Sequence, residues 1–174
     1  KNPDQRYHFF AKDRPELEGG IAYIRLASFQ DKNTARLLKH SIMDLLNQVD
    51  YPLKGLILDL TGNGGGLLDQ AIEVANLFLE EKEITSLKGR DMKKTKTYTA
   101  GKGALLKGIP IVLLIDNDTA SAAEIVAGAL KDHDRAILVG TPTFGKASVQ
   151  SILPLAGDAV ALRLTTHHYY TPQG

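Results

Sequence analysis

The sequence contains no cysteine and no tryptophan, and neither sign of charge dominates it. Without cysteine there are no disulfide bonds, no thiolate zinc sites and no cysteine nucleophile. The 21 Lys and Arg against 20 Asp and Glu leave a formal charge of +1, which argues against a nucleic-acid partner. No apolar run reaches the ~18 residues that a membrane-spanning helix needs. Any chemistry therefore rests on serine, threonine, lysine, histidine or carboxylates.

What is present suits one folded core. The 174 residues fit a single domain, and a hydrophobic content of 43% excludes a disordered chain. Strand-like and helix-like segments alternate, which predicts an α/β fold with a mostly parallel sheet and a C-terminal β appendage. Single strands are expected at residues 21–29, 55–60, 111–115 and 136–139, and helices at 34–49, 67–79 and 121–131. A strand pair is expected at 149–155 and 159–166, around Gly157 and Asp158. Residues 93–99 are expected to form an exposed hairpin or loop.

Both ends of the chain read as cuts inside a longer protein. The polar residues 1–19 predict a linker, or a strand that enters from a missing upstream domain. The core is expected over residues 20–174 and is truncated at its C-terminal end.

The first candidate site is the glycine-rich run TGNGGG at residues 61–66, between an expected strand and an expected helix. Glycines let the backbone approach a ligand, and N–H groups at a helix N-terminus point at it. A dinucleotide loop is disfavoured because Leu67 stands where the third glycine of G-x-G-x-x-G belongs. Two interpretations of the run remain, an oxyanion hole and a tight turn. Four glycines exceed what a turn requires, which favours a functional role.

The second candidate is Ser121, at an expected strand-to-helix corner among small residues. Small neighbours would let a bulky acyl group approach a nucleophile. This segment alone favours a different interpretation, in which Ser121 or Thr119 caps the helix and Glu124 completes a capping box.

The third candidate is the loop GTPTFGKA at residues 140–147, which nearly matches the phosphate-binding pattern G-x-x-x-x-G-K-[ST]. Two features oppose a nucleotide-binding enzyme. Ala147 cannot supply the hydroxyl that holds Mg²⁺, and a strand rather than a helix is expected next. Nucleotide binding stays as the less favoured alternative, and Lys146 is better explained by another role.

No histidine is placed as the base for a serine nucleophile. The G-x-S-x-G elbow is absent, and none of the five histidines lies in a motif: His8, His40, His133, His167 and His168. A serine enzyme can instead use a lysine whose pKa is lowered by burial. Lys146, flanked by Phe144, Gly145 and Ala147, is expected to be such a buried lysine.

Taken together in this order, the motifs resemble the protease core of the carboxy-terminal processing (tail-specific) serine peptidases. They occupy residues 20–29, 55–69, 119–125, 132–136, 143–150 and 169–172. Lys146 lies 25 residues after Ser121. The resemblance implies a crotonase-like (ClpP-like) core of spiral ββα units.

The resemblance also implies a catalytic site without metal or cofactor. Ser121 would be the nucleophile, Lys146 the general base, and Gln150 the residue that orients the lysine. The oxyanion hole would be formed by backbone N–H groups, from Gly65, Gly66 and Ala122. Glu124 and Asp132 fall at positions that the family retains, and we interpret them as structural support.

The chain departs from the family pattern at several positions. Thr61 replaces a usual arginine, Gly64 a proline, and Thr119 and Ala123 two serines. These departures keep open a catalytically silent core that only binds peptide tails.

The resemblance finally implies partners and a location. Protein or peptide substrates would be held by their C-terminal tails. An upstream PDZ domain is expected in the full-length chain. The resemblance is compatible with an oligomer but does not require one. The location would be extracytoplasmic, in a periplasm or cell envelope.

Overall fold

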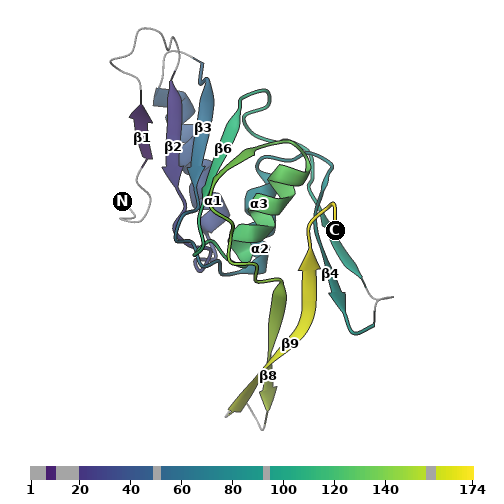
Figure 1. Ribbon diagram of the computed structural model, residues 1–174. Helices are drawn as coiled ribbons and strands as arrows, with labels where there is room; N and C mark the ends of the chain where they lie inside the picture. Colours follow the sequence, from purple (N-terminus) through teal and green to yellow (C-terminus); the bar gives the residue numbers. More distant parts are fainter. Residues whose placement is uncertain (1–6, 11–19, 49–51, 92–94, 156–159) are drawn as a thin grey trace.

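The first of two β-sheets is five-stranded and mostly parallel (Figure 1). The computed structural model describes residues 7–10, 20–48, 52–91, 95–155 and 160–174. The strand order is β1-β2-β3-β6-β7, with β1 antiparallel to β2 and the other pairs parallel. The strands are β1 (Tyr7–Phe10), β2 (Ile21–Arg25), β3 (Gly55–Asp59), β6 (Ile111–Ile115) and β7 (Ile137–Gly140).

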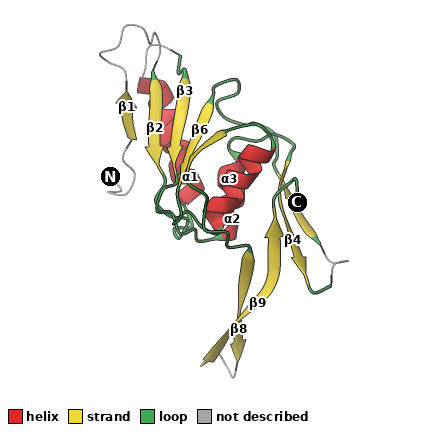
Figure 2. Ribbon diagram, in the orientation of Figure 1, coloured by secondary structure: helices red, strands yellow, loops and turns green. Residues whose placement is uncertain are grey.

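The second sheet is antiparallel, and helices lie between the two sheets (Figures 1 and 2). Its order is β5-β4-β9-β8, from β4 (Glu83–Gly89), β5 (Lys96–Thr99), β8 (Ser148–Leu155) and β9 (Val160–Tyr170). The helices are α1 (Thr34–Gln48), α2 (Leu68–Asn76) and α3 (Ala122–Asp132), and α2 and α3 occupy the space between the sheets. Within the described ranges, no helix combines the length and the apolarity needed to cross a bilayer.

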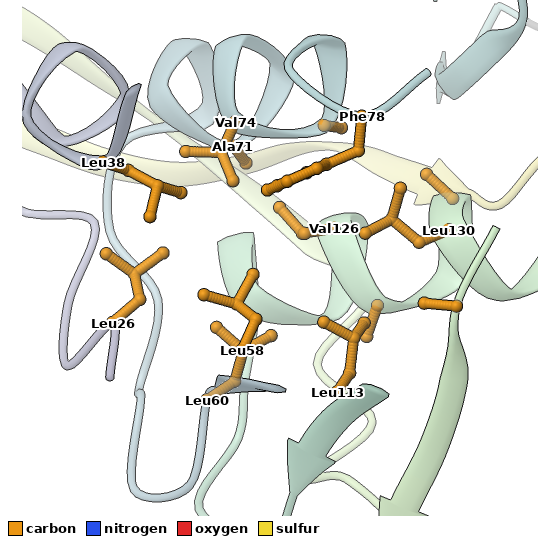
Figure 3. Close-up of a cluster of buried hydrophobic side chains, with 14 of the residues drawn as sticks. Leu26, Leu38, Leu58, Leu60, Ala71, Val74, Phe78, Leu113, Val126 and Leu130 are labelled. Carbon is orange, nitrogen blue, oxygen red and sulfur yellow. The ribbon is translucent and has the colours of Figure 1, made fainter. Parts of the chain in front are cut away.

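The hydrophobic core joins the first sheet to the helices. Leu58 of β3 and Leu113 of β6 meet Val126 of α3, and Phe78, just past α2, packs beside them (Figure 3). All four side chains are buried, and each fully buried leucine or phenylalanine contributes about 1.5–3 kcal/mol of burial free energy. The short apolar runs of β3 and β6 are therefore long enough to anchor the loops that follow them.

The predicted fold class is confirmed, including the mostly parallel sheet and the C-terminal β appendage. Several boundaries differ: the helix expected over residues 67–79, for example, ends at Asn76, and the largest differences are at two strands. The strand expected at residues 21–29 ends at Arg25, and Phe29 instead forms an isolated parallel bridge with Gly66. Strand β9 runs to Tyr170, beyond the expected end at residue 166, because Tyr169 and Tyr170 pair with β4.

Some sequence expectations fall on parts of the chain outside the described residues. Of the segment 1–19, Tyr7–Phe10 is described and forms β1, whereas residues 1–6 and 11–19 lie outside. The expected turn at Gly157 and Asp158 also lies outside. Of the expected hairpin at 93–99, Lys96–Thr99 forms β5 against β4.

Three loops gather at one edge of the parallel sheet. Because β3, β6 and β7 run in the same direction in neighbouring positions, their carboxyl ends meet there. The loops are residues 60–67, 116–121 and 141–147. This edge therefore brings together the three candidate sites of the sequence.

Candidate active site

A cavity of about 250 Å³ lies where these loops meet the start of β8. Five of the six predicted site residues line it: Gly66, Ser121, Ala122, Lys146 and Gln150. The sixth, Gly65, lies behind this lining. Ser121 and Lys146 are half-buried, and Gln150 is exposed.

Ser121 sits in a strained backbone conformation at the N-cap of α3. Its φ is 56° and its ψ is −116°, in a region that favours glycine. A strained turn between a strand and a helix is also how α/β-hydrolases expose their nucleophilic serine. The capping interpretation is confirmed as well, because the Glu124 carboxylate accepts the Ser121 N–H at 2.7 Å.

The Glu124 carboxylate connects the nucleophile segment to the lysine loop. Its Oε2 accepts hydrogen bonds from the backbone N–H groups of Ser121, at 2.7 Å, and Lys146, at 3.0 Å. Its Oε1 accepts from the Gly145 N–H at 2.6 Å and the Thr143 hydroxyl at 2.8 Å. Hydrogen bonds to a charged acceptor are stronger than neutral ones, so this carboxylate fixes the relative position of the two backbones.

Tyr169 of β9 joins the hydrogen-bonded cluster around Glu124. Its hydroxyl hydrogen-bonds to the Lys146 carbonyl and lies 3.3 Å from both the Ser121 carbonyl and Glu124 Oε2. Its backbone N–H donates to the Ala147 carbonyl at 2.9 Å. Burial, and then the Glu124 charge, raise the pKa of Tyr169 well above its usual value, so the phenol remains a hydrogen-bond donor.

Asn63 holds the glycine loop in place. It is fully buried, and its Nδ2 donates to the Leu26 carbonyl at 2.7 Å while its Oδ1 accepts the Gly65 N–H at 2.9 Å. Its own carbonyl accepts the Ala120 N–H at 2.9 Å. The loop is thus fastened both to the end of β2 and to the segment that carries Ser121. Sequence reasoning gave Asn63 no role.

Close backbone contacts explain two of the three consecutive glycines. A Cβ at Gly65, where φ is +90°, would lie 2.6 Å from the Ala120 carbonyl oxygen and 2.8 Å from the Ala122 nitrogen. A Cβ at Gly66, where φ is +151°, would lie 2.3 Å from the Phe29 carbonyl carbon. At Gly64 no atom would lie within 4 Å of such a Cβ. Only Gly65 and Gly66 are sterically required.

The three backbone donors expected for the oxyanion hole differ in availability. The Gly65 N–H is occupied by Asn63, as described above. For the N–H groups of Gly66 and Ala122, the described part of the chain supplies no acceptor, and both residues line the cavity. This pair can donate to an anionic oxygen beside Ser121.

Asp116 fixes the outer part of the glycine loop. Its carboxylate accepts the Gly62 N–H at 3.0 Å and the Thr119 N–H and hydroxyl at 3.0 Å. The bond from Gly62 is the main cause that lowers the pKa of Asp116 below its usual value. The buried Thr119 hydroxyl also lies 3.0 Å from the Leu60 carbonyl, so this departure from the family pattern bridges two loops.

The expected burial of Lys146 is wrong. Lys146 is only half-buried, and the neighbouring Phe144 is 68% exposed. The loop runs along the surface because its backbone is held by Glu124 rather than by apolar packing. In the described ranges, no hydrogen bond joins the side chain of Lys146 to Ser121 or to Gln150.

The remaining candidates lie away from the cavity. The four histidines with described side chains do not line it, and His133, for example, contacts the Glu83 carbonyl at 2.6 Å. Asp132 lies at the far end of α3, where its carboxylate accepts the Gln173 N–H at 2.9 Å. The described residues contain no group of three potential metal ligands. The loop at 140–147 leads into β8, not into a helix that could cradle a phosphate.

A solved structure shares this fold over nearly the whole chain. The structure of a photosystem II D1 C-terminal processing protease superposes with a TM-score of 0.83 at 29% identity, covering 98% of this chain and 44% of that chain. The chain belongs to peptidase family S41, whose model matches residues 20–174.

Two curated relatives show how much of such proteins the chain represents. The carboxy-terminal-processing protease of Bartonella bacilliformis is 50% identical over 159 residues, which are 91% of this chain and 36% of that protein. The carboxyl-terminal-processing protease of Synechocystis is 39% identical over 153 residues, 88% of this chain and 34% of that protein. The chain thus spans about a third of the length of these relatives.

Proposed function

We propose that the chain is the catalytic core of a serine endopeptidase that cleaves protein substrates at or near their C-termini. One observation carries the proposal: Ser121 and Lys146 line the same cavity as Gly66 and Ala122, whose N–H groups have no acceptor among the described residues. Membership of peptidase family S41 supports the reaction class.

The first half of the reaction forms an acyl-enzyme. The uncharged Lys146 amine takes the proton of the Ser121 hydroxyl as Oγ bonds to the scissile carbonyl carbon. The carbonyl oxygen becomes an oxyanion that accepts hydrogen bonds from the Gly66 and Ala122 N–H groups. Lys146 then gives its proton to the leaving amine, and the C–N bond breaks.

The second half releases the product. Lys146 takes a proton from water, whose oxygen attacks the acyl carbon, and the Ser121 ester breaks to leave a new carboxyl terminus. Gln150 orients the lysine amine through a hydrogen bond, and Gly65 supports the oxyanion hole by holding Gly66 in place. Ser121 then recovers its proton from Lys146.

We also propose how the core fits into the whole protein. Residues 1–19 connect it to an upstream PDZ domain that holds substrate tails, and the protein acts outside the cytoplasm. Deletion of that upstream domain is expected to raise KM for tailed substrates, and cell fractionation tests the location.

The test of the proposed function uses the full-length protein and an unstructured protein with a C-terminal tail. Ser121→Ala and Lys146→Ala should each abolish cleavage from neutral to alkaline pH, whereas Ser41→Ala on α1 and Lys82→Ala before β4 should cleave like wild type. Mass spectrometry should detect the substrate fragment joined to Ser121. If wild type cleaves no better than Ser121→Ala, the protease proposal fails. Tail binding without cleavage would then favour a silent core.

A further inference from the structure

The cavity that holds Ser121 is lined by two cationic side chains and by no carboxylate. The cations are Lys146 and Arg163, and the other lining residues are apolar, small or neutral. In the proposed reaction Lys146 must be uncharged to accept a proton. Arg163 is the other cation of the cavity, and the proposed reaction gives it no role.

The position of Arg163 follows from the register of β8 and β9. Arg163 pairs with Ile152, and Gln150 pairs with Thr165. Since side chains alternate between the two faces of a strand pair, Arg163 and Gln150 project from the same face. Both line the cavity, whereas Leu153, Leu162 and Leu164 alternate onto the other face. The side chains of Arg163 and Gln150 are exposed, so a ligand can reach them.

The charge of Arg163 is not neutralised within the described part of the chain. No carboxylate there forms an ion pair or hydrogen bond with Arg163. A planar guanidinium matches the geometry of a carboxylate and can bind it through two parallel hydrogen bonds. A cavity wall with this charge is complementary to an anionic group on the substrate.

We propose that Arg163 determines specificity by binding a substrate carboxylate beside the scissile bond. The inference rests on the proposed function. The carboxylate has two possible sources, the C-terminal α-carboxylate of the substrate and the side chain of an aspartate or glutamate near the cleavage point. Both present the same planar anion to Arg163.

The experiment compares peptides that differ only in carboxylates. One peptide carries a free C-terminus and no acidic residue, a second is its C-terminal amide, and further amides carry a single glutamate or its glutamine equivalent at successive positions. Each is assayed with the full-length wild type, Arg163→Gln, Arg163→Lys and the control Lys82→Gln. Lys82 lies toward the opposite end of α3 from Ser121, where His133 contacts Glu83.

For a peptide whose carboxylate reaches Arg163, Arg163→Gln should raise KM and lower kcat/KM about tenfold, the loss expected for one charge-assisted hydrogen bond. Neutral peptides should be cleaved equally by both proteins, and Arg163→Lys should retain part of the effect. If the free acid responds and the glutamate amides do not, the source is the C-terminus; the reverse pattern identifies an acidic side chain. An equal effect on charged and neutral peptides, or no effect at all, overturns the inference.

A binding measurement separates this inference from the proposed function. Fluorescence anisotropy compares the same peptides on Ser121→Ala and on Ser121→Ala/Arg163→Gln, and the inference requires weaker binding of the carboxylate peptides alone by the double variant. Tail binding elsewhere in the full chain adds the same contribution to both titrations, so the effect of Arg163 is taken from the difference between the two proteins for each carboxylate peptide and its neutral counterpart. Full cleavage by Ser121→Ala would refute the proposed function, while the binding ratio would still decide the role of Arg163.

Discussion

Glu124 Oε2 lies 2.7 Å from the backbone nitrogen of Ser121, and the same oxygen accepts the Lys146 N–H at 3.0 Å. The proposed nucleophile and base are therefore held together through their backbones by one carboxylate. Glu124 would act on the reaction only through Ser121 and Lys146, so it is a positioning residue.

Glu124→Gln should impair both folding and turnover. The amide replaces one acceptor oxygen by a donor, which would face the N–H groups that the carboxylate now binds. We expect a loss of about 2 kcal/mol in the free energy of unfolding, the scale of a hydrogen bond to a charged group. Urea unfolding measures this loss of stability, and steady-state kinetics should show a fall in kcat with KM little changed.

The control is Glu81→Gln, which removes an exposed 3.7 Å pair with Lys102 and should change the free energy of unfolding by less than about 1 kcal/mol. Equal effects of the two substitutions would contradict the positioning role.

Two neighbouring glycines should respond in opposite ways. Gly65→Ala places a Cβ 2.6 Å from the Ala120 carbonyl oxygen at a positive φ, so the loop must shift away from Ser121. We expect a loss of at least about 1 kcal/mol of stability and of most cleavage activity. Gly64→Ala meets no atom and has no positive φ, and should be neutral or stabilise by about 0.4–1 kcal/mol. Thermal unfolding and a cleavage assay on both variants check this, and retention of activity in Gly65→Ala would refute the steric argument.

Asp116 should stabilise the protein in a way that depends on pH. Its folded pKa is lowered from 3.8, mainly by the Gly62 N–H. A lowered carboxyl pKa gives stability that is complete above the unfolded value and is lost as the pH falls through the folded value. The difference in urea midpoint between wild type and Asp116→Asn should therefore be constant near neutral pH and shrink below pH 3.8. Asp118→Asn, at an exposed neighbouring site, is the matched control substitution. A constant difference down to the lowest pH at which the protein folds would argue against this assignment.

Two adjacent tyrosines provide a matched pair. Tyr169→Phe removes the hydroxyl that bonds to the Lys146 carbonyl and leaves that carbonyl unpaired, at a cost of about 1–3 kcal/mol. Tyr170→Phe removes a hydroxyl that has no hydrogen-bond partner in the described ranges, and should be nearly neutral. Because the pKa of Tyr169 is raised, its hydroxyl stays protonated, and wild-type activity should not fall through its ionisation between neutral pH and pH 10. Chemical denaturation and a pH profile of both variants test this, and equal losses would count against a specific role for the Tyr169 hydroxyl.

The sequence was informative wherever one short segment carried the whole pattern. The apolar runs of β3 and β6 predicted buried parallel strands, and the glycine cluster after β3 predicted a close backbone approach that Gly65 and Gly66 make. Strand β4 escaped prediction because Thr85 and Ser86 are buried polar residues, which obscures the alternation of a strand.

Long-range partners were invisible for a different reason. Asn63 is important through the Leu26 carbonyl, 37 residues away, and Glu124 through a loop some 20 residues further on. No local pattern encodes such contacts. The expected burial of Lys146 failed in the same way, because the bonds from Gly145 and Lys146 to Glu124 hold the loop at the surface.

The attachment of Tyr169 also has a consequence for the order in which the site is completed during synthesis. The residue follows Ser121 by 48 positions, so at roughly 5–20 residues per second it is added several seconds after the serine. Until β9 pairs with β4, the Lys146 carbonyl lacks the phenol that binds it. The nascent chain therefore carries Ser121 and Lys146 before it carries the strand that links their loops, and the proposed site is completed only when β9 has docked.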